Sequence, residues 1–152
     1  MEVVHRAVAV ADVEAQAFEA RLAELRRRYG GRRSLRGFYQ IWPEPLMTVS
    51  GEHLISRVMA LCGVENIFAG LPTLAPQVSL EAVLESNPEI ILASGELPGE
   101  WTQPWQRWKQ LAAVRAGNLF YIDPDLIHRH TPRVLDGAEV LCEYAEAARG
   151  KP

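Results

Sequence analysis

The run Glu89-Ile90-Ile91-Leu92-Ala93 constrains the fold of this chain more than any other feature. A short and nearly continuous apolar run is typical of a strand in a parallel sheet, because helices cover both faces of such a sheet. Asn87-Pro88 comes directly before it and ends the preceding helix, since proline disfavours helical backbone at the residue before it. The run therefore predicts a buried strand of an α/β fold.

Strand and helix patterns alternate around this run. Further strands are expected at 35–42 and 119–122, and helices after Ser50-Gly51, at 79–86, along a face marked by Trp105, Trp108, Leu111 and Ala112, and at 134–148. The chain has 152 residues and 48% apolar content, enough for one core. We therefore expect a small three-layer α/β sandwich with a mostly parallel central sheet.

A long helix is expected before this alternating unit. Apolar residues recur with a period near 3.6 from Ala7 to Tyr29, and Gly30-Gly31 ends the pattern. This helix stands apart from the alternation, which suggests a connector whose other end packs against something upstream. We divide the chain into a connector helix at 1–33 and an α/β lobe at 34–149.

Charge and hydropathy exclude several classes of partner. Lys and Arg number 16 against 19 Asp and Glu, so no overall basic field is present to attract nucleic acid. Arginines gather at the end of the first helix, where cations suit the negative helix terminus; the alternative is a contact with phosphate or an acidic partner. No run of 18 apolar residues is present, so we expect no membrane span. The amino terminus also lacks a secretory signal pattern.

Catalytic motifs are not found in the sequence. The glycine loops GxGxxG and GxxxxGK[ST] are absent, as is the nucleophile motif GxSxG. Cys62 and Cys142 do not have metal-ligand spacing, and from the residues alone they are either two buried thiols or a disulfide pair. We expect a non-catalytic protein without a metal site or cofactor; a small α/β enzyme or nucleotide-binding module is the alternative.

A candidate binding rim follows from the order of the elements. Ligands of open α/β sheets lie beyond the carboxyl ends of the strands. Trp42 lies at the end of the first expected strand, and Leu126, Ile127 and His128 follow the last one. Such an apolar and aromatic rim suits a large, mostly apolar ligand with polar edges. Trp101, Trp105 and Trp108 are interpreted as packing residues.

The start of the 79–86 helix carries a second candidate feature. Ser79 is a plausible N-cap, and Glu81 falls in the first turn, where the helix dipole favours a carboxylate. A carboxylate beside the proline-containing loop at 74–78 is typical of a docking feature rather than of catalysis.

Five motifs in register then resemble one family over nearly the whole chain. The sequence is similar to the C-terminal lobe of the helical-backbone, class III substrate-binding proteins of bacterial ABC importers, which include cobalamin-, siderophore- and haem-binding members. The motifs are Gly51 with its following helix, Cys62-Gly63 with 65–68, 76–79 with Glu81, Asn87-Pro88 with Ile90-Ile91, and 125–129 with Thr131-Pro132-Arg133.

The resemblance implies roles for particular residues. The segment Asp125-Leu126-Ile127-His128-Arg129 matches the one that touches the corrin ring in the cobalamin binder, and Met47 and Ala75 fall near further ligand-facing positions. Cys62 and Cys142 match a disulfide pair. Glu81 matches the acidic residue that docks into arginines of the membrane permease.

The resemblance also implies partners and a location. The ligand is cobalamin or a related metal chelate, and the full-length protein is periplasmic or anchored outside the cytoplasmic membrane. The N-terminal lobe of the family is missing from this chain, so we expect weak ligand binding by one lobe alone. The apolar surface that the missing lobe would cover is a candidate for self-association.

Overall fold

A four-stranded parallel sheet lies at the centre of the computed structural model, which describes residues 2–95, 99–128 and 131–150. The strand order is β4-β1-β5-β6, and each neighbouring pair is parallel. The strands are β1 (Leu35–Gln40), β4 (Val64–Asn66), β5 (Ile90–Ala93) and β6 (Leu119–Tyr121). The prediction of an α/β fold with a parallel sheet is confirmed.

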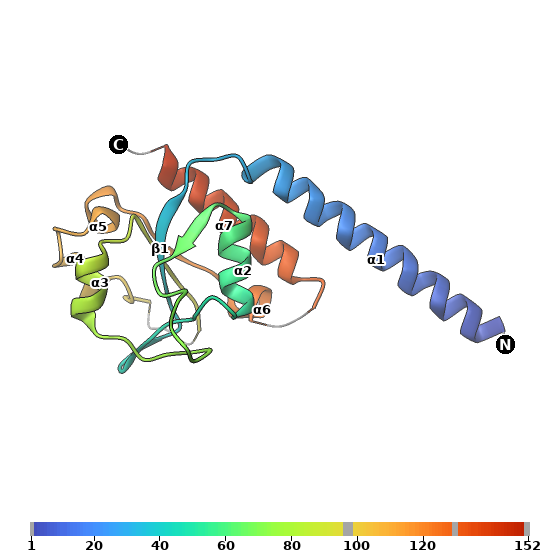
Figure 1. The fold of residues 1–152 in the computed structure, drawn as a ribbon, viewed down its shortest axis with the longest axis horizontal. Helices are drawn as coiled ribbons and strands as arrows, with labels where there is room; N and C mark the ends of the chain where they lie inside the picture. Colours follow the sequence, from blue (N-terminus) through green and yellow to red (C-terminus); the bar gives the residue numbers. More distant parts are fainter. Residues whose placement is uncertain (1, 96–98, 129–130, 151–152) are drawn as a thin grey trace.

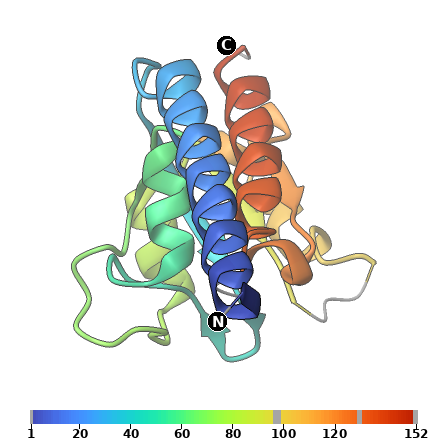
Figure 2. The same cartoon turned by 90° about the vertical axis from the view of Figure 1, so that its right-hand side faces the viewer.

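Helices cover both faces of the sheet (Figure 1). One face carries α1 (Glu2–Tyr29), α2 (Leu54–Leu61) and α7 (Val134–Arg149), and Figure 2 shows α1 lying between the other two. The opposite face carries α3 (Leu80–Ser86), α4 (Gln103–Gln106) and α5 (Ala112–Ala116), while α6 (Pro124–Ile127) packs against the start of α7. The molecule therefore has the expected three layers.

The two central strands divide their side chains between two cores. Successive residues of a strand point to opposite faces, so Tyr39 and Leu92 pack under α2 and α7 whereas Phe38 and Ile91 pack under α3 and α4. All four side chains are fully buried. This explains why the Glu89–Ala93 run is apolar at consecutive positions.

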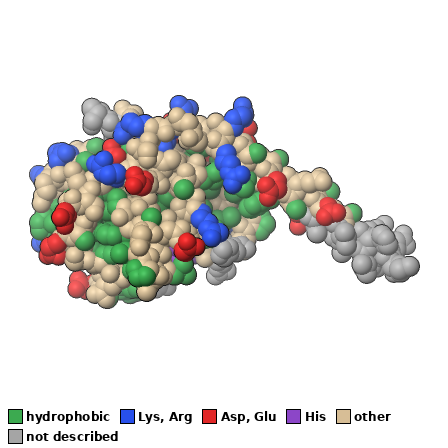
Figure 3. All heavy atoms as spheres, in the orientation of Figure 1, with side chains coloured by type: hydrophobic (Ala, Val, Ile, Leu, Met, Phe, Trp, Pro, Cys, Tyr) green, Lys and Arg blue, Asp and Glu red, His purple; other side chains and the backbone are tan. Residues whose placement is uncertain are grey.

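The helix α1 is only half packed. Leu25 and Tyr29 near its end are buried in the core, and Arg21 joins it to α7 through Asp136 at 2.6 Å and Glu139 at 2.9 Å. Figures 1 and 3 show the first half of the helix projecting beyond the body, and Val13 on it is 65% exposed. The expected long helix is present and begins at Glu2, earlier than the pattern indicates. None of the helices described is both long and apolar enough to cross a membrane.

The structure corrects several element boundaries. The strand β4 was missed, because its three residues are too few to show a pattern, and a two-stranded hairpin of β2 (Trp42–Pro43) and β3 (Leu46–Met47) follows β1. The helix α2 begins at Leu54, where the His53 ring nitrogen Nδ1 accepts the Ile55 N–H at 3.1 Å, and not at Ser50-Gly51. The expected tryptophan-bearing helix is two short helices, α4 and α5.

A disulfide joins the layer of α2 and α7. Cys62 follows the last residue of α2 and Cys142 lies on α7; both are fully buried, and their Cα atoms are 4.7 Å apart. The pairing implied by the family resemblance is therefore present. It closes a loop between positions separated by 80 residues.

We expect the paired substitution Cys62→Ala and Cys142→Ala to lower the free energy of unfolding by about 2–4 kcal/mol, because the cross-link restricts the unfolded chain. Urea denaturation followed by circular dichroism measures the change. The reduced wild-type protein serves as the control and should unfold at nearly the same midpoint as the variant. Two titratable thiols in the unfolded, unreduced wild type would contradict the pairing.

Candidate functional site

Two segments that carry predicted ligand-contact residues, one with Trp42 and Met47 and the other with Ala75, lie side by side beyond the carboxyl end of β1. The Thr48 N–H donates to the Pro76 carbonyl, and the Val78 N–H donates to the Leu46 carbonyl, each at 3.0 Å. Met47 and Gln77 form a further antiparallel bridge. The hairpin at 42–47, which contains a cis peptide bond before Pro45, is thereby joined to the segment at 74–78.

The third predicted segment reaches the same rim through the residue that follows β5. The Ser94 N–H donates to the Gln40 carbonyl at 3.2 Å, and the Ser94 hydroxyl is hydrogen-bonded to the His128 ring nitrogen Nε2. His128 ends α6, whose first turn is capped by Asp123, the acceptor for the Asp125 N–H at 2.9 Å. Arg129 and His130 lie outside the described residues.

The predicted rim residues differ in exposure. Trp42 is 45% exposed and Asp125 and His128 are exposed, while Met47, Ala75 and Leu126 are half-buried. Leu74 is 55% exposed and extends the apolar surface. Ile127 is the exception, because it is fully buried in the core shared with α7 and its side chain does not reach the rim. Ile127 is thus the residue of this short helix that serves core packing.

A groove beside the hairpin was missed in the sequence. It has a volume of about 400 Å3, and it is lined by the hairpin, by 77–80 and by the half-buried Trp101 and Trp108. Trp105 is buried at its base and donates its indole N–H to the Gln40 side-chain oxygen at 2.8 Å. The packing interpretation holds for Trp105, while the other two tryptophans also form a surface. The sequence feature that could have revealed this groove is the presence of three tryptophans within eight positions.

A buried chain of polar groups runs under the rim. Tyr39 is fully buried on β1, and its hydroxyl lies 2.8 Å from the Ser94 hydroxyl, which in turn contacts His128. Burial raises the pKa of the Tyr39 phenol above its usual value and lowers the pKa of the His128 imidazole. Sequence reasoning found His128 but not its two partners, since nothing local connects residues on three different elements.

Glu81 is presented in the predicted way. Ser79 caps α3 with its hydroxyl oxygen, which accepts the Ala82 N–H at 3.1 Å, and the exposed Glu81 lies in the first turn. The other end of α3 is held by Asn87, which has the left-handed conformation with φ 49° and whose side-chain oxygen accepts the Ala112 N–H at 2.8 Å. Both ends of this short helix are therefore anchored.

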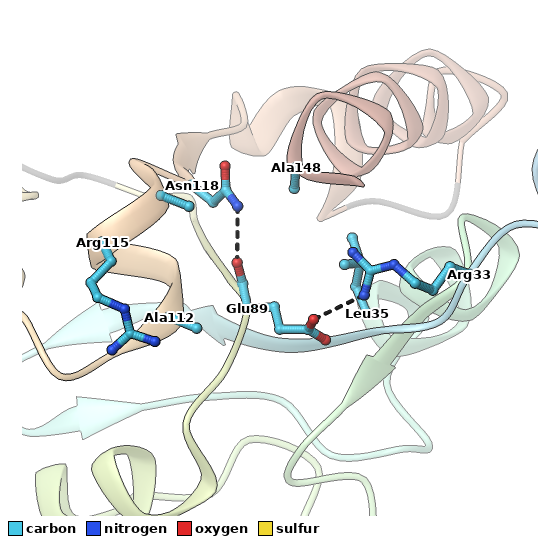
Figure 4. Close-up of a pocket in the computed structure, with 8 residues that line it drawn as sticks. Arg33, Leu35, Glu89, Ala112, Arg115, Asn118 and Ala148 are labelled. Carbon is cyan, nitrogen blue, oxygen red and sulfur yellow. Dashed lines mark hydrogen bonds and ion pairs between the residues drawn. The ribbon is translucent and has the colours of Figure 1, made fainter. Parts of the chain in front are cut away.

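A polar cavity of about 290 Å3 lies at the amino ends of the strands, opposite the rim (Figure 4). Burial alone would raise the pKa of the Glu89 carboxyl, but hydrogen bonds from the Arg36 N–H at 2.9 Å and the Arg33 guanidinium at 3.0 Å outweigh it, and the pKa lies below its usual range. Other arginines of the cluster pair similarly, Arg27 with Glu24 and Arg32 with Glu146. This cavity is held by internal ion pairs, so the rim is the better candidate for ligand binding.

No group of three or more His, Cys, Asp or Glu side chains gathers to hold a metal ion among the described residues. The rim instead combines exposed apolar surface with a few polar groups, which suits binding by shape.

Known proteins with similar sequences share this fold. No protein-family model matches the chain. The chain is 36% identical over 133 residues to the vitamin B12-binding protein of Vibrio cholerae, which covers 87% of the chain and 48% of that relative. The corresponding protein of Photorhabdus laumondii is 37% identical over 128 residues, covering 81% and 43%. The chain thus spans about half the length of the curated relatives it matches.

Solved structures also share the fold of this chain. The periplasmic vitamin B12-binding protein of Vibrio cholerae superposes with a TM-score of 0.80 at 36% identity, over 89% of this chain and 53% of that one. A possible iron-binding periplasmic solute-binding protein of Staphylococcus epidermidis gives a TM-score of 0.79 at 15% identity, over 89% and 54%, and shows the fold alone.

The parallel sheet of this chain, covered by helices on both faces, thus superposes on about half of a periplasmic vitamin B12-binding protein. The chain therefore resembles periplasmic binding proteins in both sequence and fold. These relatives are named as binding proteins, which favours a binding function over the enzyme alternative.

The His128 environment predicts a pH dependence of stability. The pKa of His128 is lowered in the folded protein, so the unfolded chain binds more protons just below the ordinary value of about 6.5. Stability is therefore lost as the pH falls from 7 through this window. We expect His128→Gln to flatten this part of the curve, measured by urea midpoints from pH 7.5 to 5. Parallel curves for the variant and the wild type would contradict the assignment.

Proposed function

We propose that this chain supplies one lobe of a two-lobed substrate-binding protein that captures cobalamin, or a related metal chelate, for an ABC importer. The observation that carries the proposal is the 36% identity to a vitamin B12-binding protein across 87% of the chain. The exposed apolar rim around Trp42 supports it, because a corrin or porphyrin presents a broad, flat apolar face.

The division of the chain supports a two-lobed protein. We propose that residues 1–33 form the connector between lobes and that residues 34–149 form the lobe itself. The first half of α1 projects from the body while its second half packs on α7, and the curated relatives are about twice as long as this chain. A connector must be anchored in one lobe and extend to the other.

In this proposal the rim forms one wall of the ligand site. Trp42, Met47, Ala75 and Leu126 contact the apolar face of the chelate, whereas Asp125 and His128 meet polar groups at its edge. One wall gives about half of the contacts, and each loss of about 1.4 kcal/mol weakens binding tenfold. Binding by this lobe alone is therefore expected to be weak, and self-association through the same rim would compete with it.

We expect the Trp42→Ala substitution to weaken cyanocobalamin binding at least fivefold, because Trp42 is the most exposed aromatic residue of the rim. Isothermal titration calorimetry compares the affinities of the two proteins, and nuclear magnetic resonance (NMR) titration of the four indole N–H signals of the wild type locates the bound ligand. The Trp42 signal should shift, while that of Trp105, which is buried and bonded to Gln40, should not.

The control is Val13→Ala, which removes an apolar side chain that is even more exposed than Trp42 and lies on α1, away from the rim. Haem and a ferric siderophore are titrated in parallel to identify the chelate. The ligand class is wrong if none of the three shifts the Trp42 signal at millimolar concentration.

We also propose that Glu81 docks onto a basic surface of the permease. In the complete transporter, Glu81→Ala should reduce uptake of labelled cobalamin several-fold without changing ligand affinity, since the carboxylate is exposed and turned away from the core. Glu143→Ala is the control, because Glu143 is an exposed carboxylate on the helix layer across the sheet. Equal loss of uptake and affinity would instead mean that Glu81 is structural.

A further inference from the structure

In the buried chain of polar groups under the rim, the donor and the acceptor of each hydrogen bond can be assigned. The Tyr39 hydroxyl is fully buried, and Ser94 is its one hydrogen-bond partner among the described residues. If the Ser94 hydroxyl donated to Tyr39, the phenolic proton would be buried without an acceptor, which costs about 1–3 kcal/mol. Tyr39 therefore donates and Ser94 accepts.

The assignment for Ser94 also fixes which nitrogen of His128 accepts a hydrogen bond. Because the Ser94 oxygen accepts from Tyr39, its own proton is free to point at the His128 nitrogen Nε2. In a neutral imidazole one nitrogen is a donor and the other an acceptor, so Nε2 as acceptor places the proton on Nδ1. Burial lowers the pKa of His128 and so favours this neutral form at pH 7.

The proton-bearing side of the ring has no partner in the described part of the chain. The structure shows no hydrogen bond to His128 Nδ1 within those residues, and the residue is exposed beside Ser94. A donor held in one orientation from beneath and open at the rim is suited to bind a ligand acceptor.

Resting on the proposed function, we infer that Tyr39 and Ser94 lock His128 as a neutral Nδ1–H donor that recognises a hydrogen-bond acceptor, such as an amide carbonyl, at the edge of the bound chelate. His128 is then a specificity-determining residue, and Tyr39 and Ser94 are positioning residues.

The same geometry argues against metal ligation by His128. A neutral imidazole binds a metal through a nitrogen that carries no proton. Nε2 already accepts from Ser94, and Nδ1 carries the proton, so neither nitrogen offers a lone pair to the chelated ion. The imidazole thus forms a hydrogen bond with a group at the edge of the ligand and does not coordinate its metal.

The protonation state is tested first, without ligand. Long-range proton–nitrogen NMR on the whole chain distinguishes a protonated from an unprotonated ring nitrogen, and we expect His128 Nδ1 to be the protonated one at pH 7.5. Ser94→Ala removes the donor to Nε2 and should move the proton to that nitrogen. Tyr39→Phe frees the Ser94 oxygen to accept and should give a mixture of the two forms.

The matched control is Ser56→Ala. Ser56 is also a buried serine, and it lies on α2, where its hydroxyl accepts from the Asn66 side chain at 3.2 Å. This variant should lose a similar hydrogen bond yet leave the His128 signals unchanged. A wild-type His128 protonated on Nε2 would overturn the inference whatever the ligand.

Ligand recognition is tested with cyanocobalamin and aquocobalamin. Ser94→Ala should weaken cyanocobalamin binding roughly threefold to tenfold, which is the value of one hydrogen bond, whereas Ser56→Ala should not. Binding of aquocobalamin should leave its visible spectrum free of a histidine-ligation change. Normal affinity in Ser94→Ala, or such a spectral change that disappears in His128→Gln, overturns the inference alone. If the chain binds no chelate, the proposed function is overturned as well. The His128 tautomer is still measured separately, because that NMR experiment needs no ligand.

Discussion

The parallel pairing of β1 with β5 is the interaction on which the rest of the structure depends. Residues 37–40 pair with 90–93, and side chains from both strands enter the two cores on either face of the sheet. Because both faces of these strands are buried, helices must cover both, and the chain connections must return across them. The same pairing places the ends of β1 and β5 next to each other, so the loops after them meet at one rim.

The rim is assembled by main-chain hydrogen bonds rather than by side chains. The segment 74–78 is held along 46–50, and Ser94 is held to Gln40, so the positions of Trp42, Met47 and Ala75 follow from the backbone. The indole N–H of Trp42 adds a local hydrogen bond to the Glu44 carbonyl at 3.1 Å. His128 is different, because a polar chain from the core orients it.

The helix α1 and the disulfide are both connected to α7. The second half of α1 is fixed to α7 by the ion pairs of Arg21, and α7 is fixed to α2 by Cys62 and Cys142. The second half of α1 is thus anchored to the helix layer, and the first half extends from that anchored base. In the proposed function such a base transmits the orientation of one lobe to the other.

Local patterns in the sequence determined the layered α/β class, the long first helix, the capped start of α3 with Glu81, and the apolar character of β5. Periodicity and capping involve neighbours a few residues apart, so they can be recognised without the fold. Only the tertiary structure decided the three-residue strand β4, the groove between the hairpin and the tryptophans, the burial of Ile127, and the chain from Tyr39 through Ser94 to His128. The links of that chain join residues 55 and 34 positions apart. Such contacts exist only once the sheet has brought its strands together, because no local preference specifies which distant side chains will meet.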